Sequence, residues 1–153
     1  MNLVIDSEKF NKDNVFFQDA VKNNIIDDSK FMRLHYSNHL FTLNGIFILF
    51  NLSLSQIEPY FNKSKFIYNT KQNSKVIQQL KHIEESILDK MCIHHKTQQY
   101  KLYEQLNSGH IKLFREKLSK NYTNYEFIIK ISGIWENDYH YGLTYKFVEL
   151  TRS

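Results

Sequence analysis

The sequence predicts a mainly β fold with some helix, an α+β protein built as one domain over residues 1–153. Short runs alternate apolar and polar residues with the two-residue period of strands. One long segment instead repeats its apolar residues every three or four positions, as an amphipathic helix does. No Pro/Gly/Ser-rich linker and no internal repeat divides the chain, so a second domain is not expected.

Residues 1–29 are predicted to form a helical N-terminal extension. Within residues 8–21, Phe10, Phe17 and Val21 lie near helical spacing. The pattern changes to strands at residue 30, so residues 30–150 are expected to form the core of the domain.

The first predicted strand covers residues 30–37. Met32, Leu34 and Tyr36 occupy alternate positions there, so they should share one side of the strand. The intervening side chains then face the opposite side, and residues 37–39 are predicted to form a turn.

Two further strands are predicted before the main helix. Residues 41–52 form a long apolar strand in which Gly45 predicts a bulge or bend. Pro59 is expected to break the chain, and residues 64–70 form a third strand. The apolar strand contributes three rings that are expected in the core: Phe41, Phe47 and Phe50.

The clearest helix is predicted for residues 74–91, with Asn73 and Ser74 as capping residues. Its apolar stripe consists of Val76, Ile77, Leu80, Ile83, Ile87, Leu88 and Met91. A second helical segment is expected to reach Leu106 and to end at Gly109.

The C-terminal region is predicted to form a strong hairpin. Residues 110–115 fit a short strand, and residues 127–133 and 141–147 alternate like two longer ones. Residues 136–138 supply the turn between these two strands.

Apart from one extra short strand, this order of elements is that of an OB-like five-stranded barrel, with a helix between strands three and four. Such barrels bind oligonucleotides on the face of strands 2 and 3 and in neighbouring loops. An α+β sandwich, with the helices on one face of a sheet, is the alternative fold.

Charge and cysteine content narrow the class of partner. Residues 61–120 carry eleven Lys and one Arg against five acids, a basic balance that suits nucleic acid. A solvated lysine-rich helix face is the alternative explanation. Cys92 is the single cysteine and no apolar run approaches the ~20 residues of a membrane span, so we expect a reducing, cytoplasmic location and no membrane.

From Lys30 to Leu150 the order of elements resembles small OB-type single-stranded DNA-binding proteins. The resemblance is to those of A/T-rich large DNA viruses and of yeast linear cytoplasmic (killer) plasmids. Its most recognisable stretch is KISGIWENDYHYGLTYKFVEL, which runs from Lys130 to Leu150. The resemblance implies protection of displaced DNA strands during replication, without enzymatic activity, in the host cytoplasm.

Single-strand binding needs cations that neutralise phosphates and flat side chains on which bases stack. The candidates on the first and third strands are Phe31, Arg33, His35, Lys63, Lys65 and Tyr68. Those of the terminal hairpin are Lys130, Trp135, Tyr139, His140, Tyr141 and Lys146. Two alternatives stay open: Trp135 closes the end of the core, and Lys63 and Lys65 guard a sheet edge against aggregation.

Catalytic, cofactor and metal sites are not expected. The sequence has no phosphate-binding loop, nucleophile elbow or H-E-x-x-H motif. Cys92 and His95 lie three residues apart, but no spaced pair completes the four ligands of a structural zinc.

The sequence therefore predicts a non-enzymatic protein that binds single-stranded DNA, with RNA equally compatible. Homo-oligomers and contacts with replication proteins fit this function. The first alternative is a replication or virion accessory protein, an interaction module that docks through helix 74–91. The second is a small nuclease that uses His94 and His95.

Overall fold

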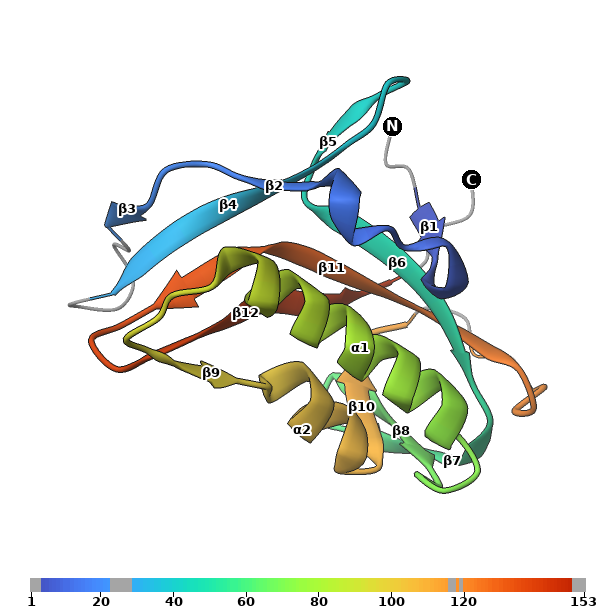
Figure 1. Ribbon diagram of the computed structural model, residues 1–153. Helices are drawn as coiled ribbons and strands as arrows, with labels where there is room; N and C mark the ends of the chain where they lie inside the picture. Colours follow the sequence, from blue (N-terminus) through green and yellow to red (C-terminus); the bar gives the residue numbers. More distant parts are fainter. Residues whose placement is uncertain (1–3, 23–28, 116–117, 119, 150–153) are drawn as a thin grey trace.

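Two β-sheets and two α-helices make up the structure, a computed structural model that describes residues 4–22, 29–115, 118 and 120–149 (Figure 1). The strands are β1 (Val4–Asp6), β2 (Val15–Phe17), β3 (Val21–Lys22), β4 (Lys30–Ser37), β5 (Thr42–Asn44), β6 (Ile46–Leu52), β7 (Leu54–Tyr60), β8 (Lys63–Tyr68), β9 (Thr97–Gln99), β10 (His110–Leu113), β11 (Tyr125–Glu136) and β12 (His140–Val148). The helices are α1 (Ser74–Met91) and α2 (Lys101–Asn107).

The main sheet is organised around β11 and curls into a half-barrel. One edge of β11 pairs first with β6 and then with β4, while the other edge pairs with β12. A bulge between Ile131 and Gly133 lies where the partner changes from β6 to β4. A bulge increases local twist, which lets one long strand follow the curve of the sheet.

The smaller sheet has the order β10-β8-β7 and follows directly from the end of β6. The prediction that Pro59 breaks the chain is wrong, because Pro59 lies inside β7 and pairs with Ser64. A proline lacks the N–H of a sheet ladder and is tolerated in an edge strand, which β7 is.

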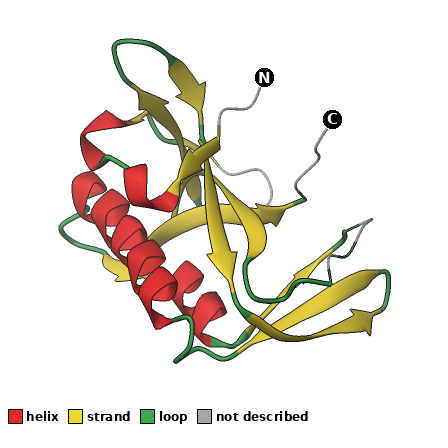
Figure 2. Cartoon of the chain, turned by 90° about the vertical axis from the view of Figure 1, so that its right-hand side faces the viewer, coloured by secondary structure: helices red, strands yellow, loops and turns green. Residues whose placement is uncertain are grey.

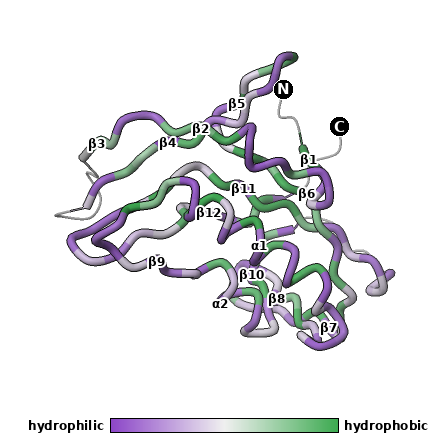
Figure 3. The backbone as a smooth tube through the Cα atoms, viewed as in Figure 1, coloured by the Kyte–Doolittle hydropathy of each residue, from purple (hydrophilic) through white to green (hydrophobic). Residues whose placement is uncertain are grey.

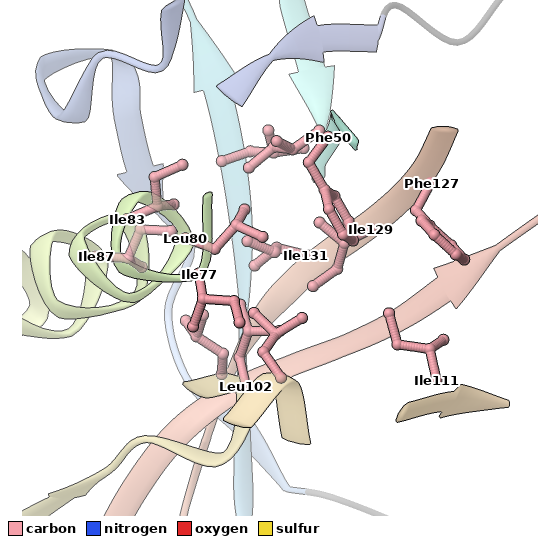
Figure 4. Packing of buried hydrophobic residues seen from close by; sticks show 14 of the residues in the cluster. Phe50, Ile77, Leu80, Ile83, Ile87, Leu102, Ile111, Phe127, Ile129 and Ile131 are labelled. Carbon is pink, nitrogen blue, oxygen red and sulfur yellow. The ribbon is translucent and has the colours of Figure 1, made fainter. Parts of the chain in front are cut away.

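Helix α1 covers the inner face of the main sheet, and its predicted apolar stripe is confirmed. Figure 4 shows Leu80 and Ile83 of α1 directed toward Ile129 and Ile131 of β11. The buried α1 residues are Ile77, Leu80, Ile83, Glu84, Ile87 and Leu88. In Figure 3 the tube is mostly hydrophobic along β6, which contributes Ile46, Ile48 and Phe50 to the same core.

A glutamate side chain of α1 accepts hydrogen bonds from the first turn of helix α2. Glu84 is completely buried and accepts backbone N–H groups from Leu102 at 2.9 Å and Tyr103 at 3.0 Å. Two free N–H groups at a helix start need such acceptors. Burial raises the pKa of Glu84 to about 7, although these two hydrogen bonds act in the opposite direction.

The prediction of an N-terminal helix over residues 8–21 is wrong. Short 3-10 turns at Ser7–Lys9 and Lys12–Asn14 lead into β2 and β3, which both pair with β4. The Asn11 side chain accepts the N–H of Asp13, a local bond that competes with helix. Residues 1–3 and 23–28 of the expected extension lie outside the described residues.

The predicted α+β class is confirmed. The first strand, the helix after Asn73 and the C-terminal hairpin lie where the pattern placed them. Gly45, with φ of +83°, divides the expected long strand into β5 and β6. Within the described ranges, no helix is both long and apolar enough to cross a bilayer.

Candidate nucleic-acid interface

The main sheet has a face that carries no helix in the described part of the chain. Figure 2 shows the helices on one side of this sheet. We call the opposite side the outer face. Since residues paired across strands project to the same side, the register assigns the following side chains to it: Phe31, Arg33, His35, Phe47, Lys130, Trp135, His140 and Lys146.

The outer face brings two predicted aromatic residues together. Phe31 on β4 lies directly opposite Trp135 on β11, and both are half-buried. Direct cross-strand neighbours have Cβ atoms about 4.5–5.5 Å apart, so the two side chains share one patch of the sheet.

Both rings lie over glycines. A Cβ added to Gly142 would be 3.0 Å from Cζ2 of Trp135, and one added to Gly133 would be 2.7 Å from Cε2 of Phe31. The missing side chains allow each ring to lie down on the backbone of the neighbouring strand. Both rings are half-buried, so part of each remains accessible to solvent.

Three cations lie on one side of the ring pair, toward the start of β11. Lys130 lies opposite Lys146 on one side and opposite Phe47 on the other, with its Nζ 5.5 Å from the Phe47 ring centroid. Arg33 lies opposite Gly133, next to the Phe31 ring. The ion pairs found among the described residues, Lys81–Glu85 and Lys96–Glu136, leave these three cations uninvolved.

The turn of the terminal hairpin continues the aromatic patch. Tyr139 is 75% exposed, and His140 follows it on the outer face. The Asn137 side chain accepts the N–H groups of both residues, at 3.0 Å and 2.8 Å. This Asx turn fixes the backbone that presents them.

Two predicted platform residues are corrected, because Tyr68 and Tyr141 are buried in the interior. The Tyr68 hydroxyl donates to the carbonyl of Leu106 at 2.5 Å, and burial raises the Tyr68 pKa well above its usual value. The Tyr141 hydroxyl donates to the carbonyl of Leu88 at 3.4 Å. Their rings are therefore not available to bases.

The alternation of β12 already contained the signal for Tyr141. It shares a side of the strand with Leu143, which is also buried. The expectation that Phe47 belongs to the core is likewise corrected, because Phe47 lies on the outer face, whereas Phe50 is buried. Alternate residues counted from Gly45 include Phe47 but not Phe50, so the two rings lie on opposite sides of β6.

The remaining predicted residues lie apart from the ring pair. Lys63 and Lys65 belong to β8 of the smaller sheet and do not join the outer face of the main sheet. His35 is half-buried, and its Nδ1 has no hydrogen-bond partner among the described residues.

Metal-ligating residues do not assemble in the described part of the chain. No group of three His, Cys, Asp or Glu side chains comes together there. Cys92 lies 3.8 Å from Nδ1 of His94, and both side chains are exposed.

No protein-family model, curated protein or solved structure matches this chain. The function is therefore inferred from the geometry of the outer face and from the chemistry of its side chains.

Proposed function

We propose that the protein binds single-stranded DNA through the outer face of its main sheet and catalyses no reaction. The observation that carries this proposal is the pair of neighbouring rings, Phe31 and Trp135, laid over glycines beside cations. Sequence-tolerant single-strand binders combine these same two features, stacking rings and a cationic path.

Each component supplies a separate part of the binding free energy. Stacking of one base on one ring is worth about 1–3 kcal/mol and tolerates any base. Arg33, Lys130 and Lys146 would contact phosphates and release counterions, so affinity falls as salt rises. Duplex DNA hides the faces of its bases, which explains the preference for an unpaired strand.

The setting of this activity follows from the resemblance to small single-strand-binding proteins of viruses and linear plasmids. From this resemblance we propose that the bound polymer is DNA and that the fold is of the OB type. We also propose that the protein coats single strands during replication. The order of β4, β6, α1 and the β11–β12 hairpin supports this description.

The alternative of a helix-docking interaction module has less support. The apolar stripe of α1 packs on the main sheet and is not free for a partner. The outer face is instead the surface on which rings gather with cations that take no part in the two ion pairs found among the described residues.

Fluorescence provides the direct test, because Trp135 is the single tryptophan of the chain. The protein is titrated with an oligothymidylate, a duplex of equal length and an oligouridylate, each across a salt series. We expect quenching of Trp135 by the single strands, weaker binding to duplex and a negative slope of log affinity against log salt. Equal binding to duplex, or a response that does not change with salt, contradicts the proposal.

A ring-removal variant tests the same site without relying on fluorescence. Trp135→Ala should weaken binding of a labelled oligothymidylate roughly 5- to 150-fold in an anisotropy titration. The matched control is Tyr103→Ala, which removes a half-buried ring beside Lys81 on the helix side of the molecule. Both variants should keep a cooperative thermal transition, and a lost transition in Trp135→Ala alone would assign this ring to the core.

A further inference from the structure

A second aromatic and basic surface lies at the end of the smaller sheet. The β7–β8 hairpin projects from the body of the molecule on the side away from the helices (Figure 2). We call its distal part, together with Lys112 of the neighbouring strand β10, the hairpin end; the hairpin itself contributes Tyr60, Phe61, Lys63 and Lys65.

The register of the smaller sheet gathers these lysines on one face. Lys63 lies opposite Tyr60, and Lys65 lies between Glu58 and Lys112. Glu58 is the single acid among these paired positions, so the face is net positive. The Lys112 Nζ lies 3.9 Å from the centroid of the Tyr60 ring, a cation–π contact that holds this lysine over the sheet.

Phe61 is the most exposed large hydrophobic residue of the described chain, at 92%. Its φ of +52° lies in the left-handed region, which costs a residue other than glycine roughly 1 kcal/mol. The edge-on contact with Tyr60, at 4.9 Å between ring centroids, leaves most of the Phe61 ring open. The turn therefore presents a flat apolar ring to solvent beside three lysines.

This combination suits a single-stranded nucleic acid better than a membrane. An inserting loop places apolar residues together at its tip, whereas Asn62 and Lys63 share this turn with Phe61. A nucleotide instead offers a base for the ring and a phosphate for the neighbouring ammonium group.

We infer that the hairpin end is a second stacking and phosphate-binding site for the strand that occupies the outer face. This inference rests on the proposed function. Strand β6 contributes Phe47 to the outer face and leads directly into β7, which contributes Tyr60. At about 3.3 Å per residue the Cα atoms of Phe47 and Tyr60 are at most about 43 Å apart, so one DNA strand of moderate length reaches both.

A relocated tryptophan tests this site by itself. In the double variant Trp135→Phe with Phe61→Trp, the single tryptophan lies at the hairpin end while the outer face keeps an aromatic ring. An oligothymidylate of about 30 nucleotides, longer than the ~4–16 that one OB-sized site covers, should quench its fluorescence. Since Phe61 is exposed, the double variant should unfold at the same temperature as Trp135→Phe alone.

The outcomes separate the two proposals. A wild-type Trp135 response without a response of the relocated tryptophan overturns the hairpin site and leaves the outer face in place. No response at either position overturns both. A response of the relocated tryptophan to phosphatidylserine vesicles but not to the oligonucleotide overturns the nucleic-acid site in favour of a membrane contact.

The lysines are tested through the salt dependence of binding. Replacing Lys63, Lys65 and Lys112 by Gln should reduce the slope of log affinity against log salt by about two, since each phosphate contact on a single strand contributes about 0.7. The matched control replaces three exposed lysines elsewhere, Lys71, Lys75 and Lys101, and removes the same charge. Equal slopes for the two triple variants overturn the inference.

Discussion

The two faces of the main sheet are built from alternate residues of the same strands and have opposite chemistry. On β11, Ile129 and Ile131 point toward α1 and are completely buried, whereas their neighbour Lys130 points to the outer face. The inner face is sealed by aliphatic side chains from the helix and from β6. The outer face holds rings over glycines and cations that no described carboxylate pairs.

This difference separates what stabilises the fold from what the fold offers to a partner. Aliphatic burial contributes about 25 cal/mol per Å² removed from water, and it needs neither rings nor charges. A half-exposed Phe31–Trp135 pair contributes less to stability than the same rings would in the interior. Changes on the inner face should therefore affect folding, and changes on the outer face should affect binding.

The largest expected effect is on the inner face. Ile129→Ala should lower the free energy of unfolding by about 2–5 kcal/mol, because the truncation leaves a cavity in the buried core beneath α1. Urea denaturation measures this loss. DNA binding at a temperature where the variant is folded should stay near the wild-type value, and a selective loss of binding would break the proposed separation of the two faces.

A buried carboxylate makes the stability of the inner side depend on pH. Glu84 has a pKa of about 7 in the folded protein and about 4.5 as a free group. The folded state holds this proton to higher pH than the unfolded state does. Protonated Glu84 therefore stabilises the folded state fully below about pH 4.5, and this stabilisation is lost as pH rises through 7. The free energy of unfolding falls by about 3 kcal/mol over this range.

Glu84→Gln removes this titration and keeps an oxygen for one of the two N–H groups of α2. We expect the free energy of unfolding of the variant to change less between pH 5 and pH 7 than that of the wild type. Glu8→Gln, at an exposed position outside α1, is the control. Parallel pH profiles for Glu84→Gln and the wild type would show that Glu84 is already ionised at pH 5.

Strong local periodicity explains which elements the sequence predicts correctly. The α1 stripe repeats over five turns, and the C-terminal hairpin alternates over both of its strands. The segment before β4 has no such repeat, and its short strands exist because β4 offers them an edge. The residues paired in this way are separated along the sequence, so the pairing leaves no local pattern.

The candidate site shows the same limit. Alternation on β4 predicts that Phe31, Arg33 and His35 share a face, and the structure confirms this grouping. The register that brings Phe31 next to Trp135 spans more than one hundred residues and has no counterpart in either strand alone. Tyr68 and Tyr141 were expected on the surface because an aromatic residue in a strand fits a platform and a core equally well.

An intermediate effect is expected at Gly142, the outer-face glycine that lies against the Trp135 ring. Gly142→Ala places a Cβ 2.9 Å from the Gln99 carbonyl oxygen and 3.0 Å from the Trp135 indole. The Gln99 carbonyl of β9 and the indole must both move away from the new Cβ, which should cost about 1–3 kcal/mol of stability. The Trp135 emission maximum should shift to longer wavelength, as more of the ring meets water. Thr144→Ala, two residues along β12, should leave the emission unchanged.

The smallest effect on stability is expected for the outer-face cations. Lys130→Gln should change the free energy of unfolding by no more than about 0.5 kcal/mol, since its ammonium group forms no ion pair among the described residues. Its effect should instead be seen in the salt dependence of DNA binding, whose slope decreases by about 0.7 for one lost phosphate contact.

Lys75→Gln, on the exposed first turn of α1, is the control for charge alone. If both variants change the slope equally, DNA binding depends on the net charge of the protein and not on the outer face. A difference confined to Lys130 means that the phosphate path crosses the sheet beside the two rings.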